Sequence, residues 1–324
     1  MDTTRAPTKL GRAVRTGLAW AVLGGLVAWL ASQVSDVSWR ELLGAVRPPP
    51  WWAWVLSTAG LAASYLCRGL RIHAELSRRH PVTRGECLRV MLLHNAAVNV
   101  VPMRGGEAAY PLLVNRRLGV PLGQAVASLV WIRAQDMLLL AVLLVLFLPR
   151  FPLWARGGLA VLVLTAVLLG IALVQRFVAR RAEAAPPRSK LLRTALAALE
   201  ALSDAPRHGV AGWLFGAGSW AVKLAALGLL LAHLGGFPWL DAVTGALWGE
   251  LAGILPIQGP ANFGTYEAGV AAGVAVFGRS VLHAAAPALA LHLFSLASAL
   301  AAGGLAWVFS PRGSPAPPPE ADHA

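Results

Sequence analysis

Two segments of this sequence bring acidic, basic and amide side chains together with Pro and Gly inside otherwise apolar stretches. The first segment contributes Asn95, Asn99, Pro102, Arg104, Gly105, Gly106 and Glu107. The second segment contributes Glu250, Pro256, Gln258, Gly259, Asn262, Gly264, Tyr266 and Glu267. Because Pro lacks a backbone donor and Gly permits a sharp turn, each segment is expected to break a helix and to leave backbone groups that need protein or water as partners. The polar side chains at these breaks are therefore candidates for binding a polar ligand.

The charged residues of these segments also have simpler explanations. Arg104 and Glu107 would cost little if the first turn reached only the lipid headgroups, whereas an ionisable group deep in a membrane costs roughly 2.5 to 3.5 kcal/mol and indicates a function. Glu267 lies near a predicted helix N-terminus, where the helix dipole alone would favour it. Glu250 lies in the middle of an apolar run, so it is either protonated, paired or in contact with water.

Three more charged residues lie inside long apolar runs. Arg133 and Asp136 are three residues apart, on adjacent faces of one predicted helix, where they can pair with each other. In the functional interpretation Arg133 holds an anionic group, because its planar guanidinium suits a phosphate, and Asp136 orients it. Lys223 is the corresponding cation later in the chain, and snorkelling towards an interface is its alternative explanation.

The sequence contains no motif for metal, nucleotide or nucleophilic chemistry. It has no Walker loop, no Gly-x-Ser-x-Gly and no His-Glu-x-x-His. His94 and His292 each stand alone on an apolar stretch, without the spacing of metal ligands. We therefore expect no metal site, no cofactor and no catalytic residue.

The composition indicates where these side chains lie. Of the 324 residues, 57% are hydrophobic and 13% are charged, and the mean hydropathy is +0.61. Apolar runs of 18 or more residues can cross ~30 Å of hydrocarbon as helices. The sequence therefore predicts an all-α, polytopic integral membrane protein with spans at about 16–33, 51–67, 122–148, 157–175, 209–234 and 283–309. The net charge of +13 comes from basic clusters between the runs, which orientation in a membrane explains better than nucleic-acid binding does.

Two broken stretches, Val90 to Val114 and Ala242 to Gly278, are interpreted as re-entrant hairpins, because their apolar arms are too short to span. If each hairpin enters and leaves on one face, the positive-inside rule puts roughly 20 of the Lys and Arg residues, and both termini, in the cytosol. Each half then has two spans, a hairpin and a third span, and the hairpins enter from opposite faces. This arrangement is an inverted-topology repeat. Kinked spanning helices are the alternative.

The predicted domain organisation follows from these segments. A basic cytosolic N-terminus occupies 1–15, and a single transmembrane domain occupies 16–310, with repeat halves at about 16–148 and 157–309. An amphipathic surface helix is predicted at 191–202. The Pro-rich tail at 311–324 is predicted to be disordered.

Three motifs in order carry a resemblance to a known family. They are Asn95-x-x-x-Asn99-x-x-Pro102-x-Arg104-x-Gly106-Glu107, then Arg133-x-x-Asp136, then Leu255-Pro256-x-x-Gly259 to Gly264-x-x-Glu267. The set resembles the flippase-like transmembrane domain of bacterial lysylphosphatidylglycerol synthases, over roughly residues 10 to 310. This chain departs from the pattern at Ile132, at Ala109-Tyr110 and at Pro260-Ala261-Asn262, where the family commonly has Glu, Arg and Pro-Gly-Gly. The resemblance implies movement of a lipid between leaflets, and it does not imply lipid aminoacylation, because the soluble transferase domain is absent.

The function expected from the sequence is that of a flippase in the bacterial cytoplasmic membrane, which moves a polar-headgroup phospholipid or a lipid-linked precursor. Arg104 and Arg133 would hold a phosphate, while Glu107, Glu250 and Glu267 would balance a cationic headgroup or carry protons. One rival is an intramembrane transferase or hydrolase that uses Glu107 or Glu267 as a general base. Another is a non-catalytic subunit of a lipid-synthesis complex. The expected partners are the lipid and a lipid-modifying enzyme, and the oligomeric state stays open.

Overall fold

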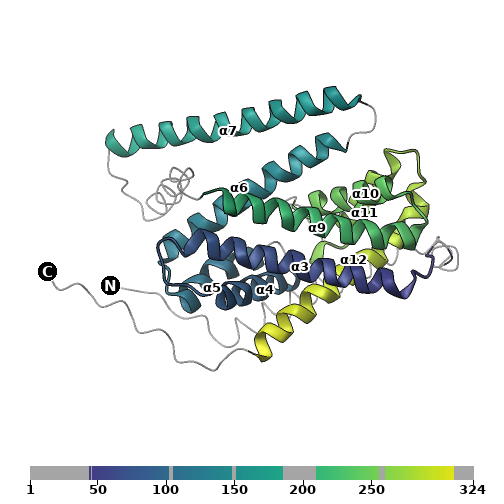
Figure 1. Cartoon of the computed structure of the whole chain (residues 1–324), viewed down its shortest axis with the longest axis horizontal. Coiled ribbons are helices and arrows are strands. Elements are labelled where there is room, and N and C mark those ends of the chain that lie inside the picture. The colour runs from purple at the N-terminus through teal and green to yellow at the C-terminus, as the bar shows by residue number, and fades with distance from the viewer. Residues whose placement is uncertain are drawn as a thin grey trace, which may run out of the picture. The chain divides into compact units, whose positions relative to one another are not determined.

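The computed structural model describes residues 44, 46–101, 105–147, 151–184, 209–254 and 260–309. The chain divides into two compact units, Met1–Ala45 and Val46–Ala324, and the second is described below. Its described residues form nine α-helices and two short 3-10 helices, without a β-strand (Figure 1). The predicted all-α class is therefore confirmed for this part of the chain.

The first part of this unit consists of a long helix, a broken helix pair and a second long helix. The elements are α3 (Trp51–Leu76), α4 (Arg84–Val100), the 3-10 helix η1 (Gly105–Ala108), α5 (Ala109–Leu118) and α6 (Leu122–Leu146). Thr83 caps α4, because its hydroxyl accepts a hydrogen bond from the backbone N–H of Glu86 at 3.3 Å. The interruption predicted inside the 90–114 stretch is confirmed by the end of α4 at Val100 and the start of η1 at Gly105.

The second part repeats this order of elements. After α7 (Leu153–Ala184), which packs against α6, come α9 (Gly209–Gly235), α10 (Trp239–Ala252), the 3-10 helix η3 (Pro260–Asn262), α11 (Thr265–Ala275) and α12 (Val281–Val308). The interruption predicted inside the 242–278 stretch is confirmed by the end of α10 and the start of η3. Ser280 caps α12 by accepting a hydrogen bond from the backbone N–H of His283 at 3.3 Å.

The two parts pack against each other in a crossed pattern. The first long helices, α3 and α9, lie along each other, and Ser57 of α3 donates a hydrogen bond to the carbonyl of Ala226 on α9 at 2.9 Å. The arm before each break packs against the last long helix of the other part, so that α4 contacts α12 and α10 contacts α6. Within each part, the arm after the break packs against the arm before it. Exchanging the two parts therefore leaves this pattern of contacts unchanged.

Three helices in the described residues have the length and hydropathy of a membrane span. They are Leu122–Leu146, Val210–Gly235 and Val281–Val308. The helices expected at 51–67 and 157–175 are longer than predicted, at Trp51–Leu76 and Leu153–Ala184. In both, the helix continues past the apolar run into a basic segment, because Arg and Lys have good helix propensity and the polarity of a residue alone does not end a helix.

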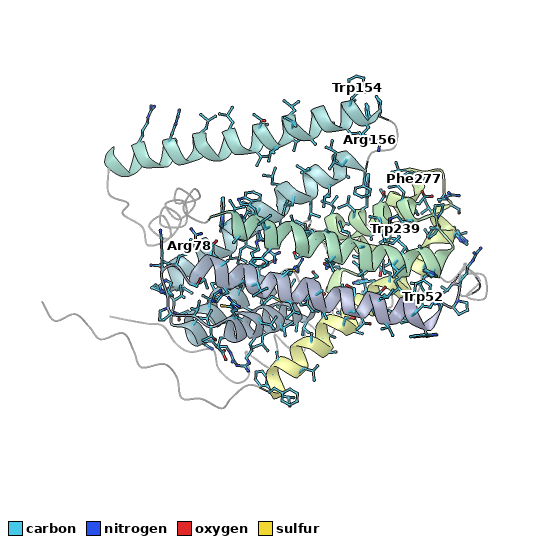
Figure 2. All side chains as sticks on the ribbon, in the orientation of Figure 1. Trp52, Arg78, Trp154, Arg156, Trp239 and Phe277 are labelled. Carbon is cyan, nitrogen blue, oxygen red and sulfur yellow. The ribbon has the colours of Figure 1, made fainter. Side chains whose placement is uncertain are left out.

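Exposed Trp residues lie near the first residues of three helices. Trp52, Trp154 and Trp239 are exposed near the starts of α3, α7 and α10, and Figure 2 places them at the end of the unit opposite to Arg78. Exposed Trp residues near helix ends fit a helix bundle whose ends lie in the interfaces of a membrane. The predicted span 16–33, the surface helix 191–202 and the segments 1–15 and 311–324 lie outside the described residues.

Candidate functional site

A cavity of about 160 Å³ lies where the two parts meet, and ten elements from α3 to α12 contribute to its lining. One water needs roughly 10 to 15 Å³ of such space, so the cavity has room for several waters or a small polar group. The buried apolar side chains of the unit form two clusters, and the cavity lies between them. Its walls include Tyr65 and Met91 from the first cluster and Trp220 and Tyr266 from the second. The cavity is therefore a polar space enclosed by apolar packing.

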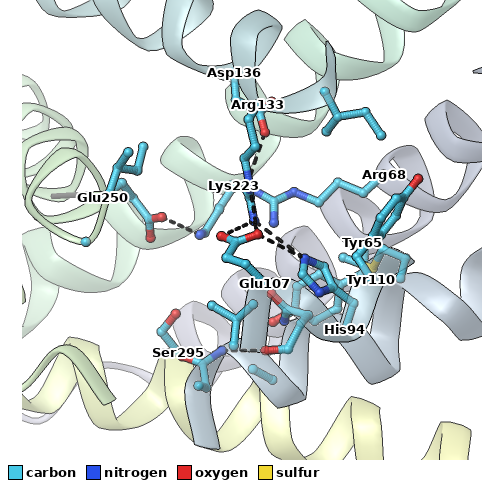
Figure 3. A pocket seen from close by; sticks show the side chains of 18 of the residues that line it. Tyr65, Arg68, His94, Glu107, Tyr110, Arg133, Asp136, Lys223, Glu250 and Ser295 are labelled. Atoms are coloured by element: carbon cyan, nitrogen blue, oxygen red, sulfur yellow. Dashed lines mark hydrogen bonds and ion pairs between the residues drawn. The ribbon is translucent and has the colours of Figure 1, made fainter. Parts of the chain in front are cut away.

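An ion pair joins the first broken pair to the middle of α6. The guanidinium of Arg133 lies 2.7 and 2.9 Å from the two carboxylate oxygens of Glu107, which follows the break in η1 (Figure 3). His94 on α4 lies 3.7 Å from the same carboxylate and 3.5 Å from Arg133. The side chains of Arg133 and Glu107 are 34 and 21% exposed, so this cluster is the wetter part of the cavity wall.

Asp136 is the centre of a second, drier network. Its carboxylate accepts hydrogen bonds from Arg71 of α3 at 2.6 Å and from the indole N–H of Trp220 on α9 at 3.0 Å. Arg71 also donates to the side chain of Gln135 at 2.7 Å and to the carbonyl of Ile132 at 2.9 Å. The charged groups of Arg71 and Asp136 are thus buried, and their hydrogen bonds link α3, α6 and α9.

The second part carries two carboxylates on either side of its break. Glu250, near the end of α10, lies 2.5 Å from the ammonium of Lys223 at the middle of α9. Glu267 accepts a hydrogen bond from the backbone N–H of Gly264 at 2.7 Å, and its other oxygen lies 2.7 Å from His292 of α12. Glu267 therefore lies at a helix N-terminus, as the sequence predicted, and it also contacts His292.

The backbone before Glu267 has an unusual conformation. Ala261 and Asn262 both adopt positive φ angles, 50° and 65°, which is the left-handed region that favours glycine. The turn places the side chain of Asn262 in the cavity wall together with Tyr266, which stacks on the ring of His292. The family that the sequence resembles commonly has Gly-Gly at these positions, whereas this chain adopts the left-handed conformation with two residues that carry a Cβ atom.

The structure brings together most of the predicted site residues that it describes. The described residues among them that line the cavity are Asn95, Asn99, Glu107, Arg133, Asp136, Glu250, Asn262 and Tyr266. Gly105, Gly106 and Gly264 instead shape the turns, and Glu267 reaches the cavity wall through His292. Pro102, Arg104, Pro256, Gln258 and Gly259 lie outside the described residues.

The sequence interpretation left the partners of these charges open, and the structure supplies them. Arg133 and Asp136 approach only to 3.7 Å, and each has a closer partner, Glu107 and Arg71 respectively. Lys223 does not snorkel, because it pairs with Glu250. Helix periodicity gives partners within one helix, whereas these pairs join different helices.

Two charged cavity residues were missed because the span predicted at 51–67 ended too early. Arg68 and Arg71 were counted among the cytosolic cations that follow the span 51–67, yet α3 carries both into the cavity wall. The signal that could have found them is the stripe of Leu61, Tyr65 and Ile72, which continues at helical spacing past position 67.

Within the described ranges, no group of three or more His, Cys, Asp or Glu side chains could hold a metal ion.

One protein family matches this chain over most of its length. The family model described as the lysylphosphatidylglycerol synthase TM region matches residues 17–303. No protein with a curated description matches the chain significantly. The family match and the long apolar helices together make the chain a multi-pass membrane protein.

Proposed function

This chain belongs to the family of lysylphosphatidylglycerol synthase TM regions, and we propose that it moves the headgroup of a membrane lipid between the two leaflets of the bacterial cytoplasmic membrane. Members of this family are membrane domains associated with lipid modification and translocation. The headgroup would pass through the polar cavity while the acyl chains stay in the surrounding lipid. Both termini would lie in the cytosol, in keeping with the positive-inside rule.

The observation that carries this proposal is the set of charged side chains between the two parts. Arg133, Lys223 and Asp136 lie near the middle of helices α6 and α9, which have the hydropathy of spans. Ionisable side chains at that depth are costly and typically mark the pathway of a substrate or ion. A lipid pathway of this kind needs polar side chains that can bind a passing headgroup.

The proposal also includes two re-entrant hairpins that enter from opposite faces. The crossed packing of α4 with α12 and of α10 with α6 supports a two-fold relation between the parts. The ion contacts have nearly the same spacing: Glu107 and Arg133 are 26 positions apart, and Glu267 and His292 are 25 positions apart. Transporters built from inverted repeats commonly bind their substrates at broken helices near the midplane.

The experiment is a leaflet-exchange assay with purified protein in liposomes that contain a fluorescent phospholipid. We expect the wild-type protein to make the inner-leaflet lipid accessible to an external quencher, and Glu107→Gln and Arg133→Ala to slow this exchange. Arg78→Gln is the matched control, because it removes a charge from an exposed residue just after α3. Exchange at the wild-type rate in both cavity variants would contradict the proposal. Recovery of a chemically altered lipid would instead support a transferase or hydrolase.

A further inference from the structure

The charges around the cavity are not balanced. Four cationic side chains line it, namely Arg68, Arg71, Arg133 and Lys223, and three carboxylates line it, namely Glu107, Asp136 and Glu250. Each carboxylate has a cation within 2.7 Å. In the described part of the wall, one positive charge is thus left over.

The cation without a carboxylate among the described residues is Arg68. Its guanidinium lies over the ring of Trp220, 5.1 Å from the centroid, and Figure 3 shows the side chain extending into the cavity. The ammonium of Lys223 lies 5.3 Å from the same centroid. Because the indole N–H of Trp220 donates to Asp136, the ring is fixed and holds both cations at the cavity.

The repeat explains why Arg68 lacks a carboxylate. Arg68 and Asn95 are 27 positions apart on the first long helix and the arm before the first break. Lys223 and Glu250 are also 27 positions apart, on the corresponding elements of the second part. The first part therefore has a neutral amide where the second part has a carboxylate.

Three residues of the wall also carry a buried polar atom that makes no hydrogen bond to the described residues, namely Nε of Arg71, Nδ1 of His94 and the hydroxyl of Tyr266. The hydroxyl of Tyr266 is buried and makes no hydrogen bond to the described residues, although the residue lines the cavity and is only 4% exposed. Burial of a hydroxyl without a hydrogen-bond partner costs free energy. A ligand that accepts a hydrogen bond from this hydroxyl would therefore bind more tightly. Among the described residues, the cavity thus offers the cation Arg68 and the hydroxyl donor of Tyr266, while each carboxylate that lines it is already paired with a cation.

We propose that the cavity recognises the phosphate of a net-anionic lipid headgroup, with Arg68 as its cationic anchor and the Tyr266 hydroxyl as a second donor. This inference rests on the proposed function and names its substrate class. A guanidinium binds a phosphate through two parallel hydrogen bonds, which an isolated ammonium cannot do. A cationic headgroup is disfavoured, because its ammonium would have to displace Arg133, Arg71 or Lys223 from a carboxylate.

The test is lipid binding to the purified full chain in detergent, measured by the concentration dependence of its thermal stabilisation. The probes are dioctanoyl-phosphatidylglycerol, which is anionic, dioctanoyl-phosphatidylcholine, which is zwitterionic, and inorganic phosphate. The variants are Arg68→Gln, Arg68→Lys and Tyr266→Phe, and Arg78→Gln is the control because Arg78 is exposed and does not line the cavity. The melting temperature without lipid shows whether each variant is folded.

We expect phosphatidylglycerol to bind the wild-type protein more tightly than phosphatidylcholine does. Arg68→Gln should weaken this binding about tenfold or more, which is the loss typical of a hydrogen bond to a charged group, and Tyr266→Phe about fivefold. Arg68→Lys should lose less than Arg68→Gln, because it keeps the charge. The control should bind like the wild type.

Three results would overturn the inference. They are equal binding of the zwitterionic lipid, unchanged binding in both Arg68 variants, and the same stabilisation by inorganic phosphate, which would indicate a site for a free anion. Leaflet exchange of the same lipids separates this inference from the proposed function. Lipid binding that depends on Arg68, without leaflet exchange, would support this inference and contradict the proposed flippase function. Leaflet exchange that depends on Glu107 and Arg133 but not on Arg68 would support the flippase function and contradict this inference.

Discussion

Lys223 and Glu250 form an ion pair of 2.5 Å between the middle of α9 and the end of α10, and their side chains are only 12 and 13% exposed. The pair fixes the arm before the second break to the long helix that precedes it. A buried pair adds little to stability compared with an apolar pair of the same shape, but the loss of one partner leaves an uncompensated charge in a dry place. The contact is therefore expected to be sensitive to single substitutions and tolerant of a matched double substitution.

The first prediction follows from this pair. Lys223→Met should lower the free energy of unfolding by about 3 kcal/mol, because Glu250 is left buried without its cation. The double variant Lys223→Met, Glu250→Gln should recover most of this loss, since no charge remains. Thermal unfolding of the purified variants in one detergent measures both. A double variant less stable than the single one would show that the charges act independently.

The second prediction concerns the network around Asp136. Asp136→Asn keeps the shape and the acceptor for Trp220, but it leaves the guanidinium of Arg71, which is 3% exposed, without a negative charge. We expect a loss of about 3 kcal/mol in unfolding free energy. The matched control is Glu86→Gln, because Glu86 pairs at the surface with Arg89 and should cost less than about 1 kcal/mol. Equal losses in the two variants would contradict the buried network.

The third prediction concerns the turn after α4. A Cβ atom on Gly106 would lie 2.3 Å from the carbonyl oxygen of Ala97, and backbone atoms cannot give way as a flexible side chain can. Gly106→Ala should therefore displace η1 from α4 and slow leaflet exchange. Gly123→Ala is the control, since a Cβ there meets nothing within 4 Å and Ala favours a helix. Normal exchange and stability in Gly106→Ala would show that the close contact with Ala97 is absent.

The fourth prediction concerns the strained turn of η3. Ala261 has a φ of 50°, and the left-handed conformation costs a residue with a Cβ about 1 to 2 kcal/mol. Ala261→Gly should raise the melting temperature, with a gain of about 0.5 to 1 kcal/mol after the greater unfolded-state entropy of Gly is counted. Ala268→Gly, within α11, should have the opposite sign. Destabilisation in both variants would contradict the left-handed turn.

The fifth prediction concerns the orientation of the two breaks. Single cysteines at positions 104 and 262 should react with a membrane-impermeant thiol reagent from opposite sides of the bilayer. The background is Cys67→Ser, Cys87→Ala, because both native cysteines are free and Cys87 is buried. Labelling of both positions from the same side would contradict the opposed hairpins.

The sequence alone was sufficient for the helical class, the two breaks and most of the charged cavity residues. Apolar runs are set by composition, and Pro and Gly act on their own neighbours, so these features are local. Charged residues in such runs stand out without any knowledge of the fold, which is why Glu107, Arg133 and Glu250 were identified. The match of one family model to residues 17–303 agrees with the resemblance that the motifs had indicated.

Only the tertiary structure decided which charges meet. Arg71 and Asp136 are 65 positions apart, and Trp220 reaches the same carboxylate from 84 positions away. Such pairs depend on how α3, α6 and α9 cross, and helix crossing is set by packing over the whole bundle and not by the spacing of residues along one helix. The absence of a carboxylate partner for Arg68 among the described residues was visible only in the structure, because it depends on which helices the fold places beside α3.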